Sequence, residues 1–427
     1  MKKTIFLLSI ISLFLSSCSE GVSESITYKI NEPVFMSTQD FRNSLKVTKN
    51  TVEITDYGKI AFYNGYLYIC ESGKGIHIID NRVPSSPANV GFIELLGNAD
   101  LAIRNNLLYA DSYIDLVWFD VTNPAQPTFK GRLENIFPKA LPIIENEFGI
   151  DYALCYPENA NQGVVVGWQL KERTEPINEY TGGWFWRWGG PTLDGVATTN
   201  TAGSSSNGIN GSMSRFTLYN NNLYTVTENQ MTIFDLTGEM PKKAAESIYI
   251  GWNVETIFSY KDNMFMGTPT GMLIYSVTDP LKPIFQSSVS HVFGCDPVVV
   301  DNDLAYVTVH SGNNCGQNAN DLFIVDVKDV KKPKQVATFA MTSPKGLGID
   351  DGKLFLCDNG LKIFTITSPT ELYLKSLKNI EGMLGYDLIA YNNTLMMIAE
   401  DGLYQYNYAN INDIKFLSKL AFAKKAN

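Results

Sequence analysis

Three tryptophans at alternate positions are the most distinctive candidates for ligand contact in the sequence. Trp184, Trp186 and Trp188 lie in the segment GGWFWRWGG at residues 182–190. In an extended segment, the three rings project to the same side. Such a row suits stacking on sugar rings, burial against protein, or contact with a membrane or partner. Because three exposed tryptophans would form a large apolar patch, we expect the segment to pack against the rest of the protein.

The histidines carry no catalytic signature. His77, His291 and His310 are the only histidines, and no two have the spacing of metal ligands. The sequence contains no HExxH, Walker-type loop, dinucleotide fingerprint or GxSxG motif. We therefore expect no metal site and no cofactor. His77 is expected to be a packing residue.

These candidate residues lie within or between repeated units of about 40 residues, the length of one propeller blade. Each unit begins with an apolar strand, a tight turn and a second apolar strand, as in KIAFYNGYLYI at 59–69 and GLGIDDGKLFL at 346–356. The Asn-Gly and Asp-Gly pairs supply the positive φ angles of tight hairpins. A third strand, a proline-bearing turn and a fourth strand follow. The sequence therefore predicts an all-β propeller of four-stranded antiparallel blades.

A short polar residue ends the third strand of every unit. The number of these residues gives the number of blades. These residues are Asp80, Asp120, Asp235, Ser276, Asp326, Thr365 and Asn407. We expect their side chains to accept hydrogen bonds from the following turn rather than to bind metal. Seven units predict seven blades, with an insertion at 134–213 between blades two and three. Two alternatives stay open: an eighth, degenerate blade within 146–176, and a strap formed by 32–37 that adds to the last blade.

The repeat resembles the LVIVD-repeat propellers found in many bacterial surface lipoproteins. LFIVDV at 323–328 and GIHIIDNRVPSSPANV at 75–90 carry the likeness, which covers roughly residues 57–133 and 214–420. The resemblance implies a β-propeller and no particular activity. The chain departs from it at Ser276, Thr365 and Asn407, which replace the usual Asp, and in the long insertion.

Propeller connectivity sorts the loops between the two ends of the molecule. The tight turns between strands one and two, and between strands three and four, fall at one end. The insertion 134–213, the long loop 310–321 and the segment with His291 fall at the other. Long loops on one face of a rigid scaffold are where function concentrates. Cys295 and Cys315 lie at this end, and we expect them to form a disulfide, with two free thiols as the alternative.

Charged residues gather at the same end, where the innermost strands begin. The binding candidates at these positions are Lys59, Asp100, Arg215, Asp296, Lys345 and Asp387. An apolar residue follows each strand-one start, so the charges lie above a hydrophobic layer. A ring of mixed charge could orient a polar ligand, or it could only solvate the channel mouth. Cys70, Cys357 and Cys155 lie elsewhere, and the first two are expected to be small buried residues.

The N-terminal residues resemble a bacterial lipoprotein signal. Lys2 and Lys3 precede an apolar run that is short for a membrane span and ends in LSSC, so that Cys18 is the expected lipidation site. Residues 1–17 are then a removed signal peptide and 18–32 a polar tether. Ser19 after the cysteine favours sorting to the outer membrane, facing either the cell surface or the periplasm.

Charge excludes one class of partner. Without Lys2 and Lys3 the chain has 34 − 2 = 32 basic and 44 acidic side chains, a net charge of −12. An acidic body with no basic stripe argues against nucleic acid. The mature protein is then a propeller over 33–427 that meets the membrane only through its lipid.

The sequence favours a non-enzymatic module that binds a glycan or a protein through the face bearing the insertion. Two alternatives remain. One is a polysaccharide-active lyase or glycosidase that uses carboxylates around the channel, such as Asp100, Asp296 and Asp387. The other is a structural subunit of a surface complex.

Overall fold

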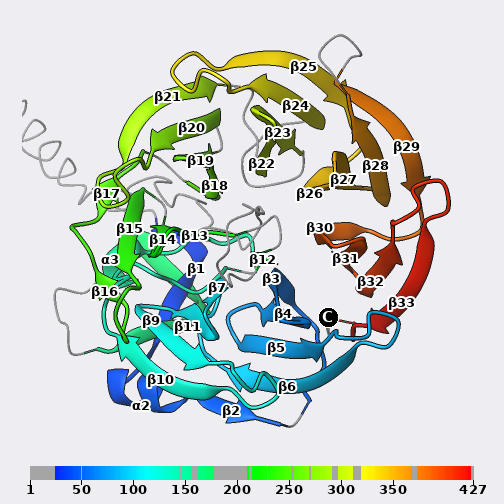
Figure 1. The fold of residues 1–427 in the computed structure, drawn as a ribbon. Helices are drawn as coiled ribbons and strands as arrows, with labels where there is room; N and C mark the ends of the chain where they lie inside the picture. The colour runs from blue at the N-terminus through cyan, green and yellow to red at the C-terminus, as the bar shows by residue number, and fades with distance from the viewer. Residues whose placement is uncertain are drawn as a thin grey trace, which may run out of the picture.

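The computed structural model describes the chain in twelve segments. They are residues 25–49, 51–144, 146–155, 162–176, 209–210, 214–227, 229–251, 254–268, 271–290, 297–310, 319–367 and 373–424. Their strands form seven blades around a central channel (Figure 1). The predicted all-β, seven-bladed propeller is therefore confirmed.

The first three blades flank the insertion. Blade one comprises β3 (Tyr57–Tyr63), β4 (Tyr66–Glu71), β5 (Gly75–Asp80) and β6 (Ala88–Glu94). Blade two comprises β7 (Leu101–Arg104), β8 (Leu107–Ser112), β9 (Asp115–Asp120) and β10 (Thr128–Leu133). Blade three comprises β13 (Phe216–Tyr219), β14 (Asn222–Thr227), β15 (Gln230–Asp235) and two short outer strands, β16 (Lys242–Lys243) and β17 (Ile248–Tyr249).

The last four blades are regular. Blade four comprises β18 (Phe258–Tyr260), β19 (Asn263–Thr268), β20 (Gly271–Ser276) and β21 (Ile284–Ser290). Blade five comprises β22 (Val298–Asp301), β23 (Leu304–Val309), β24 (Asp321–Asp326) and β25 (Lys334–Ala340). Blade six comprises β26 (Pro344–Asp350), β27 (Lys353–Asp358), β28 (Leu361–Ile366) and β29 (Leu374–Ile380). Blade seven comprises β30 (Gly385–Tyr391), β31 (Thr394–Ala399), β32 (Gly402–Asn407) and β33 (Lys415–Ala421).

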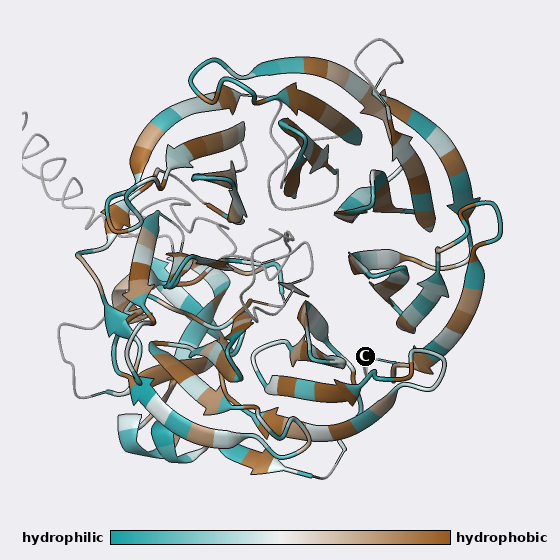
Figure 2. Cartoon of the chain, viewed as in Figure 1, coloured by the Kyte–Doolittle hydropathy of each residue, from teal (hydrophilic) through white to brown (hydrophobic). Residues whose placement is uncertain are grey.

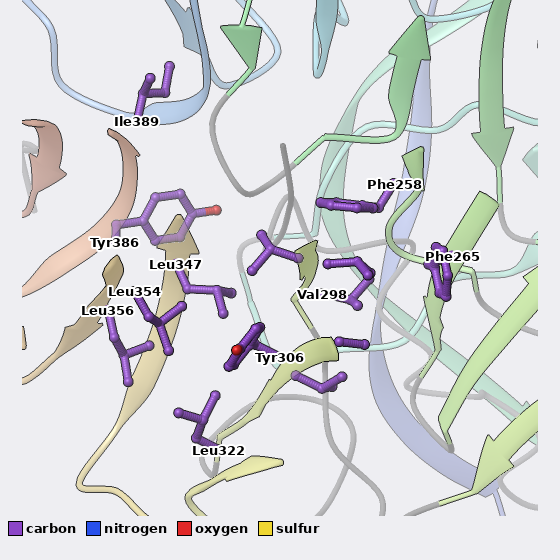
Figure 3. Packing of buried hydrophobic residues seen from close by; sticks show 14 of the residues in the cluster. Phe258, Phe265, Val298, Tyr306, Leu322, Leu347, Leu354, Leu356, Tyr386 and Ile389 are labelled. Carbon is purple, nitrogen blue, oxygen red and sulfur yellow. The ribbon is translucent and has the colours of Figure 1, made fainter. Parts of the chain in front are cut away.

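The hydrophobic pattern explains why the blades stack. Strand two of each blade is almost entirely buried, while the outer strands β21, β25 and β33 share one half-buried pattern. The inner strands are correspondingly apolar and the outermost strands alternate (Figure 2). Facing side chains of neighbouring blades interdigitate, as Leu347, Leu354 and Leu356 of blade six do with Tyr306 and Leu322 of blade five (Figure 3). Burying both faces of each sheet is what holds the ring together.

The turns have the predicted chemistry. Asn64, Asn220 and Asn392 adopt positive φ between strands one and two. Six of the seven third-strand end residues accept a hydrogen bond from the backbone N–H two places on. They are Asp80, Asp120, Asp235, Ser276, Asp326 and Asn407. Their structural role is therefore confirmed at these six positions. We call this end of the propeller the turn end.

The ring closes between the last blade and the first. The N–H of Ala423 donates to the carbonyl of Ile54 at 2.9 Å. Asn81 and Gln405 exchange side-chain hydrogen bonds at 2.9 and 2.7 Å, and both residues are buried. These contacts join residues more than 300 positions apart in the sequence.

The N-terminal segment binds the insertion and not the last blade. β1 (Ser25–Met36) pairs antiparallel with β11 (Val164–Pro176). The prediction that 32–37 adds to blade seven is therefore wrong. The possible eighth blade is also excluded, because 152–155 form the short helix α3 (Tyr152–Cys155) and β11 pairs only with β1 within the described chain. Blade seven already has four strands of its own, so it does not require residues 32–37 as an additional strand.

Other strands of the N-terminal segment and of the insertion pair with blade one. β2 (Lys46–Thr48) pairs with β6 as an additional outer strand. β12 (Ile209–Asn210), near the end of the insertion, pairs with β3 inside the central channel (Figure 1). The helix α2 (Thr38–Asn43) lies between β1 and β2 and buries Phe41. The described parts of the insertion and of the N-terminal segment therefore contact blades one and two.

Candidate functional site

A pocket of about 500 Å³ opens at the end opposite the tight turns, between blades one to three and the insertion. Its floor comprises the starts of the innermost strands and the loops between strands two and three. Its cover, which we call the roof, comprises residues 136–143, Asn146 and 166–168. The volume lies in the range of small-molecule sites. This position agrees with the end that connectivity predicted, and we call it the pocket end.

The structure brings three of the predicted site residues together in this pocket. Lys59, Asp100 and Arg215 line it. Lys59 lies in the first half of β3, and Asp100 and Arg215 immediately precede β7 and β13. Eight further predicted positions lie outside the described residues: Cys18, Trp184, Trp186, Trp188, His291, Cys295, Asp296 and Cys315. The predicted disulfide and the tryptophan row are thus not placed by the structure.

Lys345 and Asp387 lie at the same end but do not line the pocket. The Lys345 ammonium lies 5.9 Å from the centre of the Tyr386 ring. Asp387 is fully buried and accepts a hydrogen bond from the N–H of Leu388 at 2.8 Å. Of the described charged candidates at the channel mouth, Lys59, Asp100 and Arg215 therefore line this pocket, whereas Lys345 and Asp387 do not.

Asp100 connects blade two to blade three beneath the pocket. Its carboxylate accepts from Leu101 N at 2.7 Å, from Ser214 Oγ at 3.0 Å and from Phe216 N at 3.1 Å, as well as from Arg215 N. Burial raises the pKa of Asp100 to about 6, and the nearby Lys59 ammonium and these donors oppose the rise. Asp100 is thus a structural acceptor whose charge is balanced by Lys59.

Asp111 is a pocket residue that sequence reasoning missed. Its carboxylate accepts from Ala99 N at 2.8 Å, Asp100 N at 2.9 Å and Asn98 Nδ2 at 3.1 Å. Burial and the neighbouring Asp100 charge raise the pKa of Asp111 to about 7, against the effect of its N–H donors and of Arg215. A carboxyl that titrates near neutrality in a pocket is a candidate for proton transfer.

A signal for Asp111 was present in the repeat. Strand two pairs with strand three in the same register in every blade, so the equivalent positions can be compared. They hold Cys70, Asp111, Val226, Gly267, Thr308, Cys357 and Ile398. Only blade two places a charged residue there. The expected burial of Cys70 and Cys357 is confirmed.

Two polar groups in the pocket lack protein partners among the described residues. The Oδ1 atom of Asn98 is buried and has no donor, although its Nδ2 donates to Asp100 O at 3.0 Å. The Nε atom of Arg215 is buried and has no acceptor. Buried polar groups are rarely left without hydrogen bonds, so these two atoms are candidate ligand contacts.

Aromatic side chains of the pocket are fixed by the insertion. The Tyr113 ring lies against Gly97, where a Cβ atom would come within 2.2 Å of the ring, and its hydroxyl donates to Val166 O at 3.3 Å. Trp168 Nε1 donates to Pro142 O at 3.0 Å. A glycine at 97 is needed both for this approach and for its positive φ.

The roof is anchored from two sides. Asn31 of β1 and Asn146 exchange side-chain hydrogen bonds at 2.9 Å. Asp115, fully buried in blade two, accepts from Arg42 at 2.9 Å and from Arg132 at 2.7 Å. Its other oxygen accepts from Asn135 N at the start of the insertion. These hydrogen bonds and ion pairs hold the roof and the start of the insertion against β1, α2 and blade two.

His77 is a buried packing residue, as expected. It lies against Phe92, and its Nε2 is 3.0 Å from a Glu71 carboxylate oxygen. No three His, Cys, Asp or Glu side chains gather as metal ligands in the part of the chain that the structure describes. None of its helices is long and apolar enough to span a bilayer.

Comparisons with known proteins support the fold. The LVIVD repeat family profile matches residues 56–94 and 97–135, which contain blades one and two. No curated protein matches the sequence. Among solved structures, a protein from Lactobacillus plantarum is 10% identical, with a TM-score of 0.54, over 86% of this chain and 97% of that one.

A second solved structure has a known activity. The periplasmic gluconolactonase of Pseudomonas aeruginosa is 9% identical, with a TM-score of 0.51, over 86% of this chain and 97% of that one. At such identities the likeness shows the fold alone. Together with the repeat match and the seven blades, it leads to one conclusion: this chain is a seven-bladed β-propeller whose first two blades match the LVIVD repeat.

Proposed function

We propose that the protein is a binding module whose ligand is a carbohydrate held in the pocket under the roof. The observation that carries the proposal is the pair of unsatisfied groups, Asn98 Oδ1 and Arg215 Nε, in a pocket that is also lined by Trp168 and Tyr113. Sugars offer hydroxyl groups to such atoms and C–H faces to aromatic rings.

The size and shape of the pocket favour a glycan over a protein ligand. A volume of about 500 Å³ suits a small molecule or the end of an oligosaccharide. A protein partner would need a contact area of roughly 800 Å² on each side. The tryptophan row at 184–188 belongs to the same insertion and is a proposed extension of the binding surface.

The test is binding of the mature protein to a glycan array, followed by calorimetry with the best sugar. Trp168→Ala should weaken binding, because it removes an aromatic wall. Phe416→Ala is the matched control, since Phe416 is an exposed aromatic residue on the outer strand of blade seven. A variant with alanine at Trp184, Trp186 and Trp188 tests the extension. Absence of binding to any glycan would refute the proposal.

A second candidate is hydrolysis of the bound sugar derivative. Asp111 favours it, because a half-buried carboxyl with a pKa of about 7 can accept or donate a proton at neutral pH. Since one protein of similar fold is a gluconolactonase, aldonolactones belong among the substrates tried. Acid release that is present in the wild type and lost in Asp111→Asn would support this candidate.

We further propose that the protein is anchored outside the cytoplasm through lipid on Cys18. The basis is the LSSC sequence after an apolar run at the N-terminus. Cys18→Ala should abolish incorporation of labelled palmitate and release the protein from the membrane fraction. Retention of the label in this variant would contradict the proposed lipidation site.

A further inference from the structure

Arg215 is a positively charged side chain that lines the pocket. Its side chain is half-buried and lines the pocket, and its Nε atom is buried without an acceptor among the described residues. A guanidinium presents several donors in a planar fork that matches a carboxylate. Removal of such a group from water without a partner is costly, which points to an anionic ligand group.

The backbone around Arg215 is fixed before any ligand binds. Its N–H donates to the Asp100 carboxylate, and its carbonyl accepts from Val226 N at 3.0 Å. The flanking Ser214 hydroxyl and Phe216 N–H also donate to Asp100. The arginine therefore starts from a rigid base, which reduces the entropy cost of orienting it toward a ligand.

The charges nearby leave Arg215 available. The Lys59 ammonium is the charge that stabilises ionised Asp100. The Arg215 charge lowers the pKa of Asp111 through a Coulombic interaction. The Asp111 carboxylate already accepts hydrogen bonds from Ala99 N, Asp100 N and Asn98 Nδ2. No ion pair joins Arg215 to a described residue, so its charge is not locally neutralised by a carboxylate in contact.

We propose that the carbohydrate is an acidic sugar, with its carboxylate bound by Arg215 and a hydroxyl bound by Asn98 Oδ1. This inference rests on the proposed carbohydrate function. The carboxylate would use the Nε side of the guanidinium, while the ring lies within reach of Trp168 and Tyr113. A uronic acid joins a carboxylate and several hydroxyl groups in one small molecule, as the pocket requires.

The test compares sugars that differ only at one carbon. Calorimetry at pH 7 measures glucuronate against glucose, and galacturonate against galactose. The acid should bind at least about tenfold more tightly than its neutral counterpart in one of these pairs, because a charge-assisted bidentate contact is added. Arg215→Gln should abolish the preference for the acid, and Arg215→Lys should retain part of it.

The matched control is Arg82→Gln. Arg82 is a highly exposed arginine paired with Asp80 at the turn end, so its substitution should leave the preference unchanged. Circular dichroism and the thermal midpoint of each variant establish that it is folded. Equal binding of acid and neutral sugar by the wild type would overturn this inference and leave the proposed function standing. Tighter binding of glucose 6-phosphate than of glucuronate would overturn the carboxylate assignment. Absence of binding to all of these sugars would overturn this inference, whereas the proposed function is overturned only if no glycan on the array binds.

Discussion

The aspartates at the two ends of the propeller have opposite electrostatic environments. At the turn end, Asp120 and Asp235 are partly exposed, and a backbone N–H from the following turn holds the pKa of each carboxyl below its usual value. At the pocket end, burial raises the pKa of Asp100 to about 6 and that of Asp111 to about 7. Aspartate thus stabilises turns with a lowered pKa where its carboxyl is near the surface, and it has a raised pKa where the carboxyl is desolvated.

The comparison also separates two kinds of repeat position. The turn-end residues recur in every blade, and at six of the seven positions they accept a backbone hydrogen bond from only two residues along the chain. Asp111 departs from the other blades, whereas Asp100 shares its repeat position with Asp387 of blade seven. The contacts of Asp100 and Asp111 depend on a neighbouring blade or on the loop before strand one. Structural repetition explains the turn-end bonds, whereas these longer-range contacts are particular to blade two and its neighbours.

Asp100→Ala is the substitution with the largest expected effect on this comparison. It removes the acceptor of Arg215 N and one of the acceptors of Phe216 N and of Ser214 Oγ in a largely buried location. We expect a loss of about 3 kcal/mol in the free energy of unfolding, because buried donors without partners are costly. Urea unfolding followed by circular dichroism measures it. A loss no greater than that of Asp120→Ala would refute the proposed link between blades two and three.

Trp168→Ala should reduce ligand affinity about tenfold with a smaller effect on stability, since aromatic contacts in binding sites contribute roughly this much. It removes both the pocket wall and the hydrogen bond to Pro142 O. Calorimetry with the sugar identified by the array measures the change. Unchanged affinity would show that the roof encloses the pocket without contacting the ligand.

The pH dependence of stability should differ between the wild type and Asp111→Asn. The folded-state pKa of Asp111 is raised above that of the unfolded chain, so the folded protein binds more protons between about pH 4 and pH 7. The wild type should therefore gain stability relative to the variant as the pH falls from 8 to 5.5.

Charged groups close to Asp111 also affect how the free energy of unfolding depends on pH. Asp100 raises the pKa of Asp111 and titrates in the same direction, whereas Arg215 opposes the rise. Subtracting the variant from the wild type isolates the part that belongs to residue 111. Urea midpoints across this pH range measure it, and parallel curves for the two proteins would contradict the raised pKa.

Asp120→Ala should have the smallest effect, about 1 kcal/mol or less in stability and none on ligand binding. Asp120 accepts from Thr122 N at 2.9 Å and lies 3.6 Å from the Lys130 ammonium, both near the surface. Its lowered pKa means that this contribution is present at neutral pH and is lost as the pH falls below about 4. A change in sugar affinity would show that the two ends are coupled.

The sequence alone determined the ring and the end of the propeller at which the insertion and the pocket lie. Spacing of the third-strand residues, hairpin turns and hydrophobic strands predicted seven blades, because these features repeat locally and each blade follows the same rules. Alternation of strand direction then assigned the insertion to the end opposite the tight turns. Lys59, Asp100 and Arg215 were found in the same way, from one register position in the repeat.

Only the tertiary structure decided which of these charges share a pocket. Asp111 gains its raised pKa from desolvation in the fold, where it contacts Asn98, Ala99 and Asp100. Lys345 lies at the same end of the propeller but does not line this pocket. The pairing of β1 with β11 joins segments separated by more than 100 residues, and no local pattern specifies that choice. Long-range pairing and desolvation depend on the assembled fold, so repeat periodicity could not supply them.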